Sequence, residues 1–117
     1  MIRLYGLKNC STCKKAESWL KEQGIDFSFV DYRDHPIAPA DLISYANALG
    51  GWEKMVNRSS PTWRSLSDEQ RQAGSDDAWT ALIAQFPALV RRPLTVFADG
   101  TVMVGFNETK YRHKLGI

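Results

Sequence analysis

The sequence predicts a single α/β domain, residues 1–117, with a mixed four-stranded sheet. Three observations lead to this fold class. The chain begins with a strand, a helix and a second strand, the βαβ order of parallel neighbours. A helical block fills the segment from about 39 to 86, and the remainder reads as a hairpin followed by a helix. Strands on both sides of a helical insertion indicate one sheet shared by all four strands.

The N-terminal quarter carries the βαβ signal. Residues 2–5 alternate and then meet Gly6, which suits a short strand that turns tightly at its end. Helical periodicity follows from Ser11 to Glu22, and Gly24 ends it. Residues 27–32 return to a strand pattern. This order predicts parallel strands joined by a right-handed crossover.

The middle of the chain carries helical signals of unequal strength. Pro39 suits the first turn of a helix that ends before Gly50. Periodicity is then broken, although Ser67 is typical of the cap of a short helix. Ser75 begins a clearer helix that runs to Phe86.

The C-terminal part contains the clearest hairpin signal. Strand-like residues 94–97 and 101–104 flank the turn residues Ala98-Asp99-Gly100. Asn107 is a good N-cap for a last helix that ends near Leu115.

Several aromatic residues fall at positions that face a core. These are Trp19, Phe27, Phe29 and Trp79. Trp52 and Trp63 lie in the irregular stretch, where either could line a groove beside the thiol, but the sequence does not favour that role.

The composition bounds the class of protein. Of the 117 residues 44% are hydrophobic and 24% charged, which are ordinary globular values. The net charge of +2 is dispersed, so neither a nucleic-acid partner nor a membrane anchor is expected. Two neighbouring cysteines, without a leader-like start or a membrane-length apolar run, favour a reducing cytoplasm.

The two cysteines form a C-x-x-C motif where a strand ends and a helix begins. Backbone N–H groups of a first helical turn stabilise a thiolate at Cys10, and Lys8, Lys14 and Lys15 are expected to act in the same sense. Cys13 lies one turn further along the same face, close enough to attack a mixed disulfide at Cys10. The motif therefore indicates redox chemistry.

Two other interpretations of the motif are a zinc site and a pair of inert buried thiols. A zinc site needs four ligands, and the remaining candidates, His35 and His113, stand singly and far apart. No metal is therefore expected.

Arg92-Pro93 precedes the first hairpin strand and allows two interpretations. One is a strand-start proline beside a solvated arginine pair. The other is a cis bond that brings the backbone to the thiol and turns Arg92 toward it.

Several segments together resemble the arsenate reductase-related family of the thioredoxin fold, known as ArsC/Spx/YffB, over essentially the whole chain. The segments are Leu4-Tyr5, the run from Cys10 to Ala16 with Trp19-Leu20, Asn57-Arg58, Arg91-Arg92-Pro93-Leu94, and Val104-Gly105-Phe106-Asn107-Glu108. The resemblance implies a thioredoxin-like fold with a helical insertion between its βαβ and ββα halves.

The resemblance also assigns roles to individual residues. Cys10 matches the family's nucleophile, and Pro93 matches its cis-proline. Arg58 matches an arginine that the insertion presents to an oxyanion, and Arg92 matches a second arginine at the site. Two guanidinium groups offer forks of donors to an anion and lower the pKa of a nearby thiol. Cys13 joins these residues in the expected catalytic set.

Further residues are expected to bind the substrate. They are Asn9, Ser11, Thr12, Arg58, Arg92 and Pro93.

Departures from the family pattern favour some of its branches over others but leave the alternatives open. Arsenate reductases place another arginine where this chain has Val104-Gly105-Phe106, which weakens the case for arsenate. Cys13 resembles the Spx regulators, which switch by a C-x-x-C disulfide and bind RNA polymerase. Trp63-Arg64-Ser65-Leu66 looks closest to the YffB-like branch, thought to be glutathione-dependent thiol reductases.

The resulting hypothesis is a thiol-dependent reductase in which Cys10 attacks an oxidised thiol or an oxyanion, and either Cys13 or glutathione resolves the intermediate. Glutathione is the expected co-substrate and glutaredoxin a possible partner, with no tightly bound cofactor. The alternatives are a redox-switched regulator of the Spx kind, which would bind RNA polymerase, and a genuine arsenate reductase.

Overall fold

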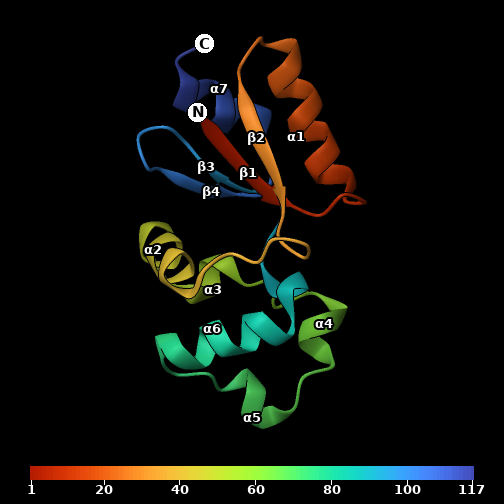
Figure 1. Ribbon diagram of the computed structural model, residues 1–117, viewed down its shortest axis with the longest axis vertical. Coiled ribbons are helices and arrows are strands. Elements are labelled where there is room, and N and C mark those ends of the chain that lie inside the picture. Colours follow the sequence, from red (N-terminus) through yellow and green to blue (C-terminus); the bar gives the residue numbers. More distant parts are fainter. The chain divides into compact units, whose positions relative to one another are not determined.

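The computed structural model describes residues 1–117 and divides into two compact units (Figure 1). The first, here called the sheet unit, joins Met1–Asp31 to Arg92–Ile117. The second, here called the helical unit, is Tyr32–Arg91. No helix of the protein has the length and apolar character that crossing a membrane requires.

The sheet unit contains four strands and two helices. They are β1 (Ile2–Gly6), α1 (Ser11–Glu22), β2 (Phe27–Asp31), β3 (Leu94–Val96), β4 (Val102–Val104) and α7 (Glu108–Leu115). The strand order is β2-β1-β3-β4. β1 pairs with β2 in parallel, whereas the β1–β3 and β3–β4 pairs are antiparallel. The predicted mixed four-stranded sheet is therefore confirmed.

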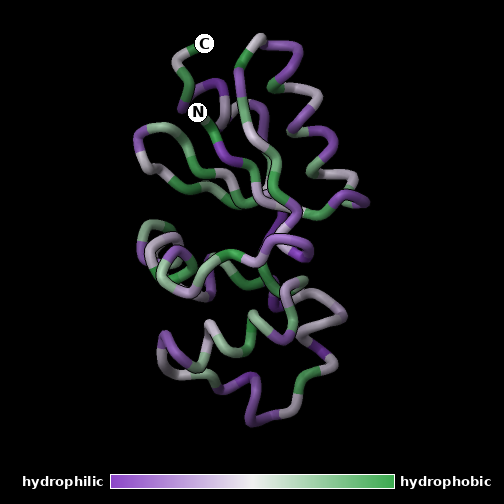
Figure 2. The backbone as a smooth tube through the Cα atoms, in the orientation of Figure 1, coloured by the Kyte–Doolittle hydropathy of each residue, from purple (hydrophilic) through white to green (hydrophobic).

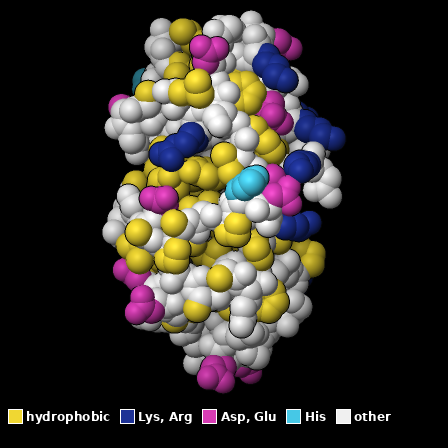
Figure 3. Space-filling view, in the orientation of Figure 1, with side chains coloured by type: hydrophobic (Ala, Val, Ile, Leu, Met, Phe, Trp, Pro, Cys, Tyr) yellow, Lys and Arg dark blue, Asp and Glu magenta, His cyan; other side chains and the backbone are white.

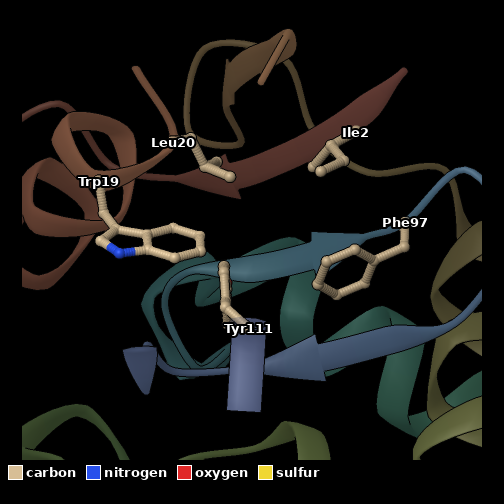
Figure 4. Packing of buried hydrophobic residues seen from close by; sticks show 5 residues of the cluster. All are labelled: Ile2, Trp19, Leu20, Phe97 and Tyr111. Atoms are coloured by element: carbon tan, nitrogen blue, oxygen red, sulfur yellow. The ribbon is translucent and has the colours of Figure 1, made fainter. Parts of the chain in front are cut away.

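A compact apolar cluster joins α1 and α7 to the sheet (Figure 4). Trp19 and Leu20 of α1 meet Tyr111 of α7, with Ile2 and Phe97 completing the cluster. The Trp19 and Tyr111 rings meet edge to face with centroids 5.9 Å apart. This edge-to-face geometry stabilises the packing of the two rings beyond the contribution of their buried surface. Figure 2 shows the hydropathy along the chain: β3 and β4 are largely hydrophobic, whereas hydrophobic and hydrophilic residues alternate along α1.

Two of the predicted core aromatics are less buried than expected. Trp19 and Trp79 are core residues, with 6% and 7% of their surface exposed. Phe27 and Phe29 are only partly buried. They lie on β2, which is an edge strand of the sheet and has a neighbour on one side alone.

The helical unit consists of five α-helices and one 3₁₀ turn, and serine caps the N-termini of three of the helices. They are α2 (Pro39–Leu49), α3 (Trp52–Met55), α4 (Pro61–Arg64), α5 (Asp68–Arg71), α6 (Asp76–Gln85) and the 3₁₀ turn η1 (Pro87–Leu89). Pro39 occupies the first turn of α2, and Gly50 ends the helix in the left-handed region with φ 98°. Ser67 caps α5 in a capping box with Gln70, and Ser75 caps α6, as predicted.

Candidate functional site

The β1–α1 loop places Cys10 at the N-cap of α1. The thiol Sγ accepts the backbone N–H of Cys13 at 3.4 Å, while the Cys10 carbonyl accepts the N–H of Lys14 at 3.1 Å. The loop is held by the N–H of Cys10, which donates to the Leu7 carbonyl at 3.2 Å. Its second anchor is the N–H of Lys8, which donates to Asp31 Oδ2 at 3.0 Å. A sulfur thus fills the capping position that serine or aspartate usually takes.

Cys13 lies directly beneath this loop and is fully buried. The end of β1 makes room for it, because a Cβ atom at Gly6 would lie 2.5 Å from Cys13 Sγ. Gly6 has no unusual φ, so the requirement for glycine here is one of space. The position of the buried Cys13 thiol therefore depends on the absence of a side chain at Gly6 in the neighbouring strand.

The two thiols have opposite acidities. Partial burial opposes ionisation of Cys10, but hydrogen bonds from the Cys13 side chain and backbone, together with the hydrogen bond and charge of Arg92, outweigh it and lower the pKa of Cys10 below 9.0. Burial, reinforced by the neighbouring Cys10, raises the pKa of Cys13 to about 12. Because the pKa of Cys10 is lowered and that of Cys13 is raised, Cys10 ionises first. Cys13 stays protonated and can donate a hydrogen bond to it.

The Arg92–Pro93 peptide bond is cis, which decides between the two interpretations of this dipeptide. Pro93 is buried, and its carbonyl accepts the N–H of Gly105 at 2.9 Å. Arg92 is partly buried and hydrogen-bonds to Cys10. The start of β3 thus supplies the cation beside the thiol.

The predicted site residues fall into two groups. Cys10, Cys13 and Arg92 come together within the sheet unit, with Pro93 adjacent to Arg92. Asn9 and Ser11 flank the thiol and are exposed, and Thr12 is partly buried. Arg58 belongs to the helical unit, and its action on Cys10 remains a prediction.

The three lysines near the motif are not among the main groups that lower the pKa of Cys10. Lys8, Lys14 and Lys15 are exposed, and Lys and Arg side chains gather along the α1 side of the molecule (Figure 3). The leading contributions that lower the pKa of Cys10 nevertheless come from Cys13 and Arg92. Exposed ammonium groups are solvated and screened, whereas Arg92 is partly buried and bonds directly.

Two features of the structure were missed by sequence reasoning. One is Asp31, a buried carboxylate at the end of β2 that anchors Lys8. The signal in the sequence that could have indicated Asp31 is a charged residue at the end of a largely apolar strand. The other is a stack of three indoles, Trp52, Trp79 and Trp63, whose consecutive centroids are 6.0 and 6.1 Å apart. Nothing local in the sequence joins these three positions.

No group of three His, Cys, Asp or Glu side chains is placed to hold a metal ion. The polar groups around Cys10 are hydrogen-bond donors and a guanidinium, which suit an anion or a thiolate.

Comparison with known proteins agrees with this geometry. The sequence model of the ArsC family matches residues 5–114. The chain belongs to the ArsC family. A relative, an uncharacterized protein of Haemophilus influenzae, is 35% identical over 112 residues, covering 96% of both chains. The global transcriptional regulator Spx of Streptococcus pyogenes is 27% identical over 96% of this chain and 83% of its own.

A solved structure also matches this ArsC-family chain. The YFFB protein superposes with a TM-score of 0.86 at 31% identity, covering 97% of each chain. The resemblance noted from the sequence is therefore confirmed, and with it the thioredoxin-like fold.

Proposed function

We propose that this ArsC-family protein is a thiol oxidoreductase that uses Cys10 as its nucleophile and glutathione as its co-substrate. The observation that carries the proposal is the Cys10 thiol at the N-cap of α1, hydrogen-bonded by Cys13 and Arg92. These contacts lower its pKa and so raise the fraction of thiolate at neutral pH. A partly exposed thiolate with a cation beside it suits attack on an anionic disulfide.

The proposed substrate is a mixed disulfide between glutathione and another thiol. The Cys10 thiolate attacks the glutathione sulfur, the substrate S–S bond breaks, and the other thiol leaves with its electron pair and takes a proton from solvent. A second glutathione thiolate then attacks the glutathione sulfur on Cys10. This step releases oxidised glutathione and restores the Cys10 thiolate, so two electrons pass from glutathione to the substrate.

Glutathione is the more favourable resolving thiol. Cys13 is fully buried, and a pKa of about 12 keeps it protonated at neutral pH. Resolution by Cys13 would require loss of that proton first. Arg92 and Arg58 are proposed to hold the carboxylates of glutathione, with Asn9, Ser11, Thr12 and Pro93 contacting the rest of the substrate. Glutaredoxin is an alternative source of the second thiol.

The test exposes reduced protein to oxidised glutathione and measures the intact mass, followed by peptide mapping. One glutathione on Cys10 is the expected product. The variant Cys10→Ser should lose both the adduct and turnover of the mixed disulfide. Cys13→Ala should still form the adduct but turn over more slowly, because it loses the side-chain hydrogen bond that lowers the pKa of Cys10. Turnover by the Cys10→Ser variant would contradict the proposal.

A second candidate function is a redox-switched regulator of the Spx kind. It is favoured by the similarity to Spx of Streptococcus pyogenes and by Cys13 standing one turn after Cys10. Under this proposal a Cys10–Cys13 disulfide would alter a surface for RNA polymerase. Loss of two hydrogens in the mass experiment, with binding of the C-terminal domain of the polymerase α-subunit by one redox form, would support it. Absence of binding by either form would reject it.

A further inference from the structure

We infer that Trp63 is a positioning residue that holds the Arg58 guanidinium ready for the carboxylate of an anionic substrate. The inference rests on the proposed function, because it concerns how Arg58 takes part in binding. The Arg58 guanidinium carbon lies 5.8 Å from the centroid of the Trp63 ring. That distance is within the range in which a cation is attracted to the face of an indole.

The backbone that carries Arg58 is held on both sides. Before it, the N–H of Asn57 donates to the Leu89 carbonyl at 2.8 Å, and Val56 bridges Val90. After it, Asn57 Oδ1 accepts the N–H of Ser59 at 3.0 Å, which forms an Asx turn around Arg58. Only the long side chain of Arg58, which is exposed, is left to be fixed.

The same turn also places Trp63. The hydroxyl of Ser60 donates to the Asn57 carbonyl at 2.8 Å and accepts the N–H of Trp63 at 3.1 Å. Ser60 is the N-cap of α4, so α4 begins at the turn that presents Arg58. The cation and the ring beneath it are therefore set by one hydrogen-bonded segment.

The Trp63 ring is in turn supported by the indole stack. Its plane lies 15° from that of Trp79, which is buried, and Trp79 stacks on Trp52 at 14°. The far end is tied by Trp52 Nε1, which donates to Asp76 Oδ1 at 2.8 Å. A ring that cannot tilt freely offers a fixed platform to the guanidinium.

This support matters because arginine loses much rotamer freedom when it captures an anion. The ring attracts the charge of the guanidinium and leaves its N–H donors for a carboxylate. Part of the ordering then precedes binding, which favours the complex. The expected size of the effect is a change of about two- to fivefold in affinity, typical of an exposed cation–π contact.

The test measures the dissociation constant of oxidised glutathione in the Cys10→Ser background, where no covalent adduct forms at the nucleophile. Trp63→Leu should weaken binding by about two- to fivefold, and Trp63→Phe, which keeps an aromatic face, should restore most of the loss. Trp52→Leu makes the same change at the end of the stack away from Arg58. It loosens the support of the Trp63 ring but leaves the ring in place, so it should weaken binding less than Trp63→Leu does. Thermal unfolding of each variant checks that it is folded.

A double-mutant cycle separates positioning from a merely structural role. In an Arg58→Gln background, Trp63→Leu should have no further effect on the dissociation constant. An equal loss with and without Arg58, unaltered binding by Trp63→Leu, or no binding of oxidised glutathione would each overturn the inference. Turnover by the Cys10→Ser variant would instead reject the proposed nucleophile while leaving this binding result intact.

One measurement requires no variant. The side-chain protons of Arg58 should show an upfield ring-current shift by NMR in the native protein, since they lie over the indole face. Resonances at ordinary positions would overturn the inference even if Trp63→Leu does not fold.

Discussion

The Sγ atom of Cys10 accepts the backbone N–H of Cys13 at 3.4 Å, so the candidate nucleophile is also the cap of its own helix. The contact joins the two cysteines through the backbone in addition to their side chains. Their chemical inequality follows from this arrangement, because one sulfur receives hydrogen bonds and the other is buried beneath it.

Alkylation should distinguish the two thiols. The rate at Cys10 is expected to rise with a midpoint below pH 9.0, whereas Cys13 should resist alkylation in the folded protein up to about pH 12. Iodoacetamide labelling over a pH series, resolved by peptide mass, measures both. Equal labelling of the two residues at pH 8 would contradict the assignment.

Arg92→Met should raise the pKa of Cys10. The substitution removes a hydrogen bond and a positive charge that stabilise the thiolate, so alkylation at pH 7 should slow and its midpoint should move upward. Arg91→Met is the matched control, because Arg91 is an exposed neighbour and lies in the helical unit. A similar shift in both variants would point to a general loss of charge.

Gly6→Ala should destabilise the protein by about 1–3 kcal/mol, the usual cost of overpacking a filled site. The added methyl would lie 2.5 Å from Cys13 Sγ and 3.2 Å from Phe29 Cε2. Gly74→Ala provides the control, since its nearest neighbour would be the Gln72 carbonyl at 3.8 Å. Urea unfolding of both variants measures the difference, and an equal effect of the two would refute the steric argument.

Tyr111→Phe should cost about 1–3 kcal/mol, because it leaves the buried Thr95 hydroxyl without its partner. The Thr95 and Tyr111 oxygens lie 2.5 Å apart within the core. The double variant Thr95→Val with Tyr111→Phe should cost less than the sum of the single changes. Strict additivity in urea unfolding would show that the two hydroxyls do not interact.

The free energy of unfolding should fall as the pH rises from about 9 to 12. Burial raises the pKa of Cys13 from 9.0 and of Tyr111 from 10.0, each to about 12. At a pH between the unfolded and the folded pKa of each group, the unfolded chain has released a proton that the folded protein retains. Alkaline pH therefore favours unfolding. The stabilisation is complete below pH 9 and is lost toward pH 12.

Matched variants assign this pH dependence. Tyr111→Phe should remove the part that begins near pH 10, and Cys13→Ala the part that begins near pH 9. Chemical unfolding at several pH values gives the slope, and a slope unchanged by either variant would reject the assignment.

Local sequence patterns predicted much of the sheet unit. The alternation in β1, the helical period of α1 and the turn residues of the hairpin are each patterns among near neighbours in the sequence. Such local patterns can be recognised in a single sequence. α3 and α4 escaped prediction because each has four residues, about one turn, and one turn leaves no periodicity to detect.

The candidate site was predictable to a similar extent. The helix-start thiol and its partner follow from the spacing of the C-x-x-C motif, while the roles of Arg92 and Pro93 came from the family resemblance. Cys13 and Arg92 lower the pKa of Cys10 more than the three nearby lysines do, and this depends on burial and direct contact, which the sequence does not show. The indole stack joins residues that are remote in sequence, and such packing is fixed only by the tertiary fold.

The capping atom of α1 is the sulfur of the candidate nucleophile, so oxidation of Cys10 would also change the stability of the helix. A thiolate is a stronger acceptor than the neutral sulfur of a disulfide, so the first turn of α1 is held more firmly when Cys10 is reduced. Regenerating the thiolate therefore restores a helix cap as well as a nucleophile. In the proposed reaction, the free energy of that cap would favour Cys10 as the leaving group when the second glutathione attacks.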